Sequence, residues 1–175
     1  MSRSRRIKVG ITMGDPAGVG PEIIAKALRD RGLKGLAEFV IIGDKWVFSR
    51  SGAVDYPPFC NFMDLNNVPH AAYKPGRVSS ANGAASMQYI GKAAQLLKKG
   101  ILDCLVTCPI SKEAIALAGF KFPGHTEYLA RMAGSRDFVM MLMNKCFKIS
   151  LVTRHIPIKQ VSSTLDSESV YKTIL

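Results

Sequence analysis

The stretch IKVGITMGDPAGVGPEIIAKAL, from Ile7 to Leu28, predicts how the chain begins to fold. It opens with the apolar, β-branched run Ile7–Met13, which is typical of a buried strand. A turn rich in glycine and proline follows at positions 14–21, and Glu22–Leu28 then has helical periodicity. One face of this helix is expected to be apolar, with Ile23, Ile24, Ala27 and Leu28 on it.

The turn between this strand and helix has the composition of an anion site. Its three glycines permit positive φ and close approach of the backbone to a ligand. Pro21 suits the first turn of a helix, where no backbone N–H is needed. A helix N-terminus at the carboxyl edge of a sheet favours anions. However, the run is neither a Walker P-loop nor a G-x-G-x-x-G fingerprint, so a tight connection that binds nothing is the alternative.

Strand-like and helix-like segments continue to alternate up to position 118. The expected strands and helices are Glu38–Ile42, Lys45–Ser51, Ser79–Lys99, Ile101–Thr107 and Ser111–Ala118, the last with Ser111 as its N-cap. The proline-containing segment Ala53–Pro75 is expected to be irregular. The alternation predicts an α/β fold with a parallel sheet.

The second part of the chain has a different pattern. The break GFKFPG at 119–124 is expected to separate a first lobe, 1–122, from the start of a second lobe, 123–175. A helix is expected over Glu127–Met132. The apolar runs Phe138–Met143 and Lys148–Thr153 predict a hairpin that turns at Asn144-Lys145. The remaining segment, 162–175, resembles an unfinished helix that starts near Asp166 or Ser167.

Composition narrows the range of functions. The chain has 175 residues, of which 47% are hydrophobic, and no apolar run reaches the roughly 18 residues of a membrane span. Its basic N-terminus is not followed by a long apolar segment, so we expect a cytoplasmic protein without membrane contact. The net charge of +11 is spread along the chain, with one dense cluster at 2–8. Anionic small substrates explain this charge more simply than nucleic acid, which we do not expect as a partner.

The four cysteines show no C-x-x-C pair. Cys104 and Cys108 lie four residues apart, a spacing that a metal pair could use. Cys104, however, falls within a buried strand pattern, and no second cysteine pair follows. We therefore predict buried free thiols at Cys60, Cys104, Cys108 and Cys146.

Three polar residues at expected helix starts are candidate ligand contacts. Lys112 stands at a helix start on the same sheet edge as the glycine turn, where it could pair with a phosphate or carboxylate, or could be exposed to solvent. His125 and Thr126 open the next helix, where both side chains can hydrogen-bond a polar ligand. The alternative for this pair is a helix cap with an incidental histidine.

Two further histidines differ in their surroundings. His155 follows an expected strand directly, in TRHIP, where site residues of α/β folds accumulate. A neutral imidazole there could bind a metal, although typical catalytic sites use three protein ligands. His70 lies in the loop sequence NNVPHAAY and is expected to be an ordinary surface residue.

Four ordered motifs carry a family resemblance. They are GDPAGVGPEI at 14–23, LVTCPISKEAI at 105–115, FPGHTEYLA at 122–130 and VTRHIPIKQV at 152–161. Together they resemble the 4-hydroxythreonine-4-phosphate dehydrogenase family of the isocitrate/isopropylmalate dehydrogenase-like superfamily. The resemblance covers essentially the whole chain, but chains of that family are about twice as long, so this sequence resembles their N-terminal half.

The resemblance implies a two-lobed α/β/α fold whose second lobe is incomplete in this chain. It implies NAD-dependent oxidation, with decarboxylation, of 4-phosphooxy-L-threonine to 3-amino-2-oxopropyl phosphate in pyridoxal phosphate (vitamin B6) biosynthesis. A divalent metal (Zn, Mg or Co) and a homodimer with a shared active site are also implied. His125 and Thr126 would contact substrate, and His155 would be one of three metal-binding histidines. The other two ligands and the NAD contacts would lie beyond Leu175, and no catalytic residue is assigned.

Two alternatives stay open. The first is a sister activity on 4-phospho-D-threonate or 4-phospho-D-erythronate. The second is a truncated, non-catalytic chain that keeps a phosphate-binding corner but has no activity at this length.

Overall fold

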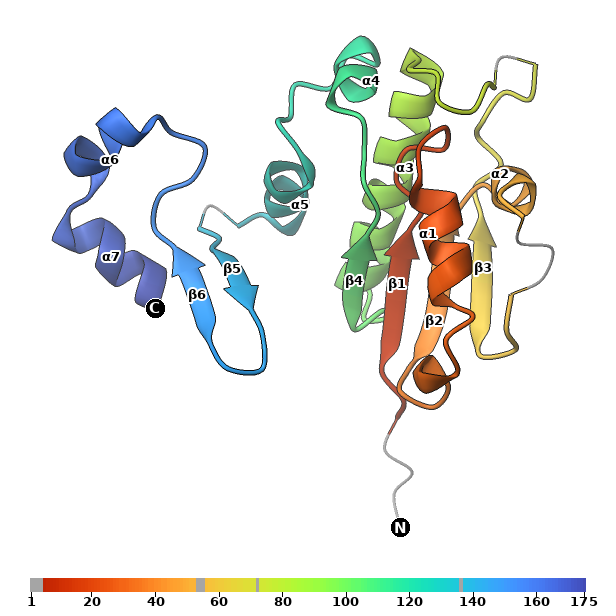
Figure 1. The fold of residues 1–175 in the computed structure, drawn as a ribbon, viewed down its shortest axis with the longest axis horizontal. Helices are drawn as coiled ribbons and strands as arrows, with labels where there is room; N and C mark the ends of the chain where they lie inside the picture. Colours follow the sequence, from red (N-terminus) through yellow and green to blue (C-terminus); the bar gives the residue numbers. More distant parts are fainter. Residues whose placement is uncertain (1–4, 53–55, 72, 136) are drawn as a thin grey trace. The chain divides into compact units, whose positions relative to one another are not determined.

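The computed structural model describes residues 5–52, 56–71, 73–135 and 137–175. The chain forms two compact units, one that ends at Gly134 and one from Ser135 to Leu175. Figure 1 shows the parallel sheet of the first unit and the small hairpin of the second. Part of the basic N-terminal cluster, at 2–4, lies outside the described residues. No described helix has the length and apolar character needed to cross a membrane.

The first unit is built on a four-stranded sheet, in which every neighbouring pair of strands is parallel. The strands follow the spatial order β3-β2-β1-β4 and are β1 (Lys8–Thr12), β2 (Glu38–Gly43), β3 (Cys60–Asp64) and β4 (Cys104–Thr107). This parallel sheet, alternating with helices along the chain, confirms the predicted α/β class. The expectation of an irregular segment at 53–75 is wrong for β3, which pairs with β2 between two groups of prolines.

Helices cover both faces of this sheet, with α1 on one face and α3 on the other (Figure 1). The helices of the unit are α1 (Gly20–Ala27), α2 (Lys45–Arg50), α3 (Ser80–Lys98), α4 (Lys112–Leu117) and α5 (His125–Ala133), with a 3₁₀ turn, η1, at Arg31–Leu33. Ser79 and Ser111 cap α3 and α4 by accepting backbone N–H groups three residues ahead. The predicted cap at Ser111 is therefore confirmed.

The core lies between the sheet and these helices. Ile41, Ile42 and Tyr89 have no exposed surface, and burial of one such apolar side chain is worth about 1.5–3 kcal/mol. The predicted apolar face of α1 is partly wrong, because Ile23 and Ala27 are exposed. The helix instead buries Gly20, Pro21, Ile24 and Ala25, and Leu28 follows them at its end.

A second apolar cluster joins α3, α4 and α5. Met87, Ile90 and Ile115 form its buried centre, and the partly buried Tyr128 and Leu129 pack against them. Because of this packing, the first compact unit runs past the expected lobe boundary at 122/123. How the lobes divide in a complete protein stays a prediction.

The cysteine expectation is only half right. Cys60 and Cys108 are buried, whereas Cys104 and Cys146 are exposed, and all four thiols are free. Cys104 lies on β4, the outermost strand beside β1, and one side of that strand has no neighbouring strand in this sheet. Side chains of a strand alternate between the two faces of the sheet, and Cys104 and Val106, which share one face of this edge strand, are both exposed.

The second unit contains the predicted antiparallel hairpin, β5 (Met140–Met143) and β6 (Lys148–Leu151). The Asn144 side chain shapes the turn, because its Oδ1 accepts the backbone N–H groups of Cys146 and Phe147. Two helices follow, α6 (Ile158–Thr164) and α7 (Ser167–Ile174), where one was expected. Asp166 caps α7 in a capping box with Ser169, which confirms the predicted start of that helix.

Candidate functional site

Two loops meet at the carboxyl edge of the sheet. The backbone N–H of Asp15, after β1, donates to the carbonyl oxygen of Pro109, after β4, at 2.9 Å. The N–H of Cys108 donates to the Thr12 carbonyl oxygen at 3.1 Å. Backbone hydrogen bonds therefore hold the β1–α1 turn and the β4–α4 turn side by side, at the edge where ligands of α/β sheets commonly bind.

The glycines of the β1–α1 turn make this contact sterically possible. Gly14 has a φ of +74°, and a Cβ added to it would collide with the Pro109 carbonyl oxygen. A Cβ on Gly20 would collide with the Met13 carbonyl oxygen. At these two positions, the close backbone approach predicted from the sequence is thus made to the chain itself.

Several polar groups of the turn are also used internally. The Asp15 carboxylate accepts the N–H of Ala17 at 2.9 Å, and the Asp15 carbonyl accepts the N–H of Gly18 at 3.0 Å. Burial raises the pKa of the Asp15 carboxyl, and the Ala17 N–H partly opposes that shift. A turn that uses the N–H groups of Asp15, Ala17 and Gly18 internally and holds a buried carboxyl fits poorly as a cradle for a dinucleotide phosphate. The geometry favours the tight-connection alternative for this turn and assigns no NAD contact to it.

His125 lies beside the two loops at the start of α5. Its Nε2 is 3.1 Å from the carbonyl oxygen of Cys108, the residue that follows β4. A carbonyl oxygen only accepts, so this bond requires a proton on Nε2 and leaves the Nδ1 lone pair free in the neutral ring. The helix starts two residues earlier than the expected Glu127, with Gly124 at the N-cap and His125 and Thr126 as its first two residues, and no side chain caps it.

Burial sets the protonation of His125. Because the ring is partly desolvated, the charged imidazolium is disfavoured and the pKa of His125 lies below 6.5, although the Cys108 carbonyl partly opposes that shift. The ring is therefore mainly neutral at pH 7. A neutral imidazole with a fixed orientation can accept a proton or a hydrogen bond from a substrate hydroxyl.

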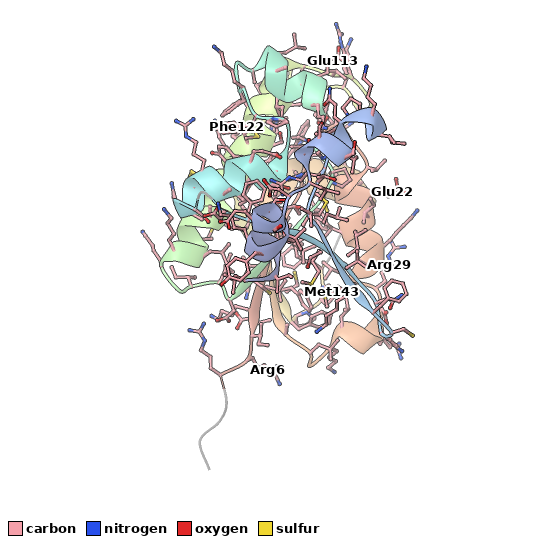
Figure 2. All side chains as sticks on the ribbon, turned by 90° about the vertical axis from the view of Figure 1, so that its left-hand side faces the viewer. Arg6, Glu22, Arg29, Glu113, Phe122 and Met143 are labelled. Carbon is pink, nitrogen blue, oxygen red and sulfur yellow. The ribbon has the colours of Figure 1, made fainter. Side chains whose placement is uncertain are left out.

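Thr126 and Lys112 lie at the first turns of two helices on the first unit. Thr126 is the second residue of α5 and is partly buried. Lys112 is the first residue of α4 and is exposed, and its neighbour Ser111 caps that helix. Figure 2 marks Glu113, the next residue of α4. Both assignments, Thr126 to substrate and Lys112 to an anion, stay predictions.

His155 belongs to the second compact unit. It follows β6, is exposed, and has a φ of +56°, which is uncommon for a residue with a side chain. Within the described residues, no group of three or more His, Cys, Asp or Glu side chains could hold a metal ion. The residues present in this chain therefore do not form a metal site by themselves, and the role of His155 as one ligand among several stays a prediction.

Three aromatic residues that the sequence did not single out as a group lie beside the β1–α1 turn. The Tyr73 hydroxyl donates to the Pro16 carbonyl oxygen at 3.2 Å. The Trp46 ring lies edge-on to Tyr73, and the His70 ring stacks on Trp46 with centroids 3.9 Å apart. His70 thus has an ordinary packing role on an aromatic surface. The sequence signal for this group was the single tryptophan, which lies in the short helix after the second strand.

Comparisons with known proteins show which family this chain resembles. A family model described as pyridoxal phosphate biosynthetic protein PdxA matches residues 36–175. A 4-hydroxythreonine-4-phosphate dehydrogenase of Trichlorobacter lovleyi is 34% identical over 95% of this chain and 55% of its own length. A D-threonate 4-phosphate dehydrogenase of Salmonella typhimurium is 35% identical over 95% of this chain and 56% of its own length. The chain therefore spans about half the length of the curated relatives it matches.

Solved structures give the same result for the fold. A 4-hydroxythreonine-4-phosphate dehydrogenase from Burkholderia phymatum has a TM-score of 0.87 and 31% identity, over 98% of this chain and 57% of its own. A terephthalate 1,2-cis-dihydrodiol dehydrogenase from Burkholderia xenovorans has a TM-score of 0.71 and 27% identity, over 97% of this chain and 55% of its own. The predicted fold class, with a second lobe only partly present in this chain, is confirmed.

Proposed function

Because the chain belongs to the PdxA family of pyridoxal phosphate biosynthetic proteins, we propose that it forms part of a dehydrogenase of phosphorylated hydroxy acids. The proposed reaction oxidises 4-phosphooxy-L-threonine, with loss of carbon dioxide, to 3-amino-2-oxopropyl phosphate. The single structural observation that carries the proposal is the neutral His125, whose ring is anchored on the Cys108 carbonyl at the carboxyl edge of the sheet.

His125 and Thr126 are proposed to position the substrate. The Nε2–H of His125 stays on the Cys108 carbonyl, so Nδ1 accepts a hydrogen bond from a substrate hydroxyl. The Thr126 hydroxyl supplies a second polar contact, and the first turn of α5 favours a nearby anionic group. Lys112 would add a positive charge for a phosphate or carboxylate.

The cofactors of the proposed reaction depend on residues outside this chain. NAD, when bound, accepts the hydride, and the protein contributes binding and orientation. His155 is proposed as one ligand of a divalent metal, with the other ligands supplied from elsewhere in the complete protein. A homodimer with a shared site and a cytoplasmic location are proposed with it.

A sister activity is the second candidate. The relative named for D-threonate 4-phosphate is as similar to this chain as the one named for 4-hydroxythreonine-4-phosphate, at 35% and 34% identity. Both substrates carry a phosphate and a secondary alcohol, so His125 and Thr126 would serve either one. A chain without catalytic activity at this length is the third candidate.

The test is a panel of substrates with NADH formation as the readout. The chain, and the complete protein that contains it, would be assayed with 4-phosphooxy-L-threonine, 4-phospho-D-threonate and 4-phospho-D-erythronate, with metal added or chelated. Turnover of the first alone supports the proposal, and turnover of the others instead supports the sister activity. Binding of the first without turnover, in every form of the protein, would support the third candidate.

Two variants of His125 test whether its ring contacts the substrate. His125→Ala in the active form should raise KM or lower kcat/KM, because it removes a positioned hydrogen-bond acceptor. His125→Asn keeps a polar group of similar reach and should lose less. Unchanged kinetics in both variants would remove His125 from the site.

A further inference from the structure

A cavity of about 610 Å³ lies at the amino edge of the sheet, opposite the edge that carries His125. Its position follows from the chain: Leu28 ends α1, Lys34 precedes β2, and Phe59 directly precedes β3. Figure 2 labels Glu22, near the start of α1, and Arg29, just past the end of α1 that faces the cavity. The cavity is thus formed by connections that lead into strands, whereas the candidate site is formed by connections that leave them.

The inner wall of the cavity is apolar and partly aromatic. Leu28 and Phe48 form its floor and are almost fully buried, at 4% and 2% exposed. Pro57 and Pro58, in contrast, contribute accessible apolar surface. Phe59 adds a partly buried ring, which lies edge-on to Phe39 with centroids 6.2 Å apart. Rings packed in this way form a rigid surface on which a flat apolar group can lie.

The rim of the cavity is basic. Arg29, Arg31 and Lys34 line it and are exposed, and within the described part of the chain none of them forms an ion pair with a carboxylate. Asp30 also lines the cavity, but its carboxylate accepts the N–H of Gly32 at 2.8 Å and so caps η1, and the rim keeps an excess of positive charge. A second cavity of about 600 Å³ next to it shares Lys34 and Phe59 and adds Arg6. Part of the net charge of +11 is therefore concentrated at this edge.

We propose that this cavity is a second ligand site, which binds a small aromatic phosphate. The volume lies within the usual range for small-molecule sites, and their usual composition is an apolar wall with a few polar groups. The ring would lie on Phe59 and the neighbouring Pro58, above the buried Leu28 and Phe48, and the phosphate would bind the cations of the rim. Guanidinium groups match phosphate geometry through paired N–H donors.

The apolar wall favours a different class of ligand from the substrate of the proposed dehydrogenase. A phosphorylated hydroxy acid is aliphatic and polar, so it would gain little from an aromatic wall. An aromatic ring with a phosphate matches both the wall and the rim. The site does not depend on the dehydrogenase activity and can be tested by binding alone.

The test uses pyridoxine 5′-phosphate as the probe, because it has a ring and a phosphate but no aldehyde to react with lysines. Its binding to the chain would be measured by calorimetry, beside pyridoxine and inorganic phosphate. Each of the two partial ligands should bind at least about tenfold more weakly than the probe, since each lacks one half of the match. Equal binding by inorganic phosphate, or no binding of the probe, would overturn the proposal.

Matched variants locate the site. Lys34→Glu and the double variant Arg29→Glu/Arg31→Glu should each weaken binding of the probe about tenfold or more, through charge reversal at the rim. Lys92→Glu makes the same exchange at an exposed position on α3 and should leave binding unchanged. Amide shifts in nuclear magnetic resonance should move at 28–34 and at Phe48. Shifts confined to Asp15 and His125 would place the ligand at the candidate site instead and contradict the proposal.

Discussion

The two compact units bury their apolar residues to different extents. In the first unit, Ile41, Ile42 and Tyr89 are completely buried between the sheet and its helices. Among residues 137–175 no residue is buried, and the hairpin exposes Met141, Leu142, Met143, Phe147 and Ile149. The second unit is ordered by local hydrogen bonds, such as the Asn144 turn and the Asp166 capping box. A two-stranded hairpin is marginal on its own, so we expect this unit to tolerate substitutions that the first does not.

The largest expected effect is a loss of activity, without loss of the fold, from one substitution in the second unit. In the complete, active protein, His155→Ala should lower metal-dependent activity by about 100-fold or more, because a ligand of the proposed metal is lost. The fold should not change, since His155 is exposed, and circular dichroism would verify this. His70→Ala, at an exposed histidine of the first unit, is the control and should keep activity. Equal activity in the two variants would contradict the assignment.

A pair of isoleucines tests the comparison of the cores directly. Ile41→Ala should lower the free energy of unfolding by about 2–5 kcal/mol, because it leaves a cavity in the first unit. Ile149→Ala, at a residue that is 47% exposed, should cost less than about 1 kcal/mol. Urea unfolding followed by circular dichroism measures both values. Similar losses would mean that the second unit has a core of comparable importance.

Substitution of two glycines that have the same φ would measure how tightly the β1–α1 and β4–α4 loops pack against each other. Gly14 and Gly134 both have a φ of +74°, but an added Cβ collides with Pro109 only at Gly14. Gly134→Ala should therefore cost about 1 kcal/mol, the cost of the left-handed conformation alone. Gly14→Ala should cost a further 1–3 kcal/mol or so, as overpacking does. Equal costs in thermal unfolding would show that the two loops separate easily.

The smallest expected effect is the pH dependence from His125. Its pKa in the folded chain is below the ordinary value of 6.5, so the unfolded state binds more protons at pH values between the folded-state pKa and the unfolded-state pKa. The contribution of the neutral ring to the free energy of unfolding is fully present above pH 6.5. It is lost as the pH falls toward the folded-state pKa, because protonation of the ring favours the unfolded state. His125→Gln should flatten the fall in unfolding free energy between about pH 7.5 and pH 5.5. An unchanged slope would mean that the ring is not desolvated.

The elements with strong local signals could be predicted from the sequence. The strand Ile7–Met13 and the long helix near 79–99 have clear periodicity, and Ser111 is a typical cap. The strand β3 was missed because it has only five residues, CNFMD, and lies between prolines. The buried face of α1 was misassigned because, in an eight-residue helix, Ile23 and Ile24 are equally plausible inner positions.

The sequence suggests candidate site residues but not their geometry. The candidates were chosen as polar side chains at helix and strand ends, and their roles stay predictions. The bond from His125 to the Cys108 carbonyl, and with it the orientation of the ring, depends on how α5 packs on α3. The exposure of Cys104 depends likewise on which strand lies outermost, and local sequence does not specify that order.

The single tryptophan gives this chain a built-in optical probe. Trp46 contacts the stacked ring of His70 and the guanidinium of Arg50, whose Cζ is 5.3 Å from its ring centroid. Tyr73 touches the same indole and also donates to the Pro16 carbonyl in the glycine turn. Movement of that turn when a molecule arrives would therefore alter the fluorescence of Trp46, without any label attached to the protein.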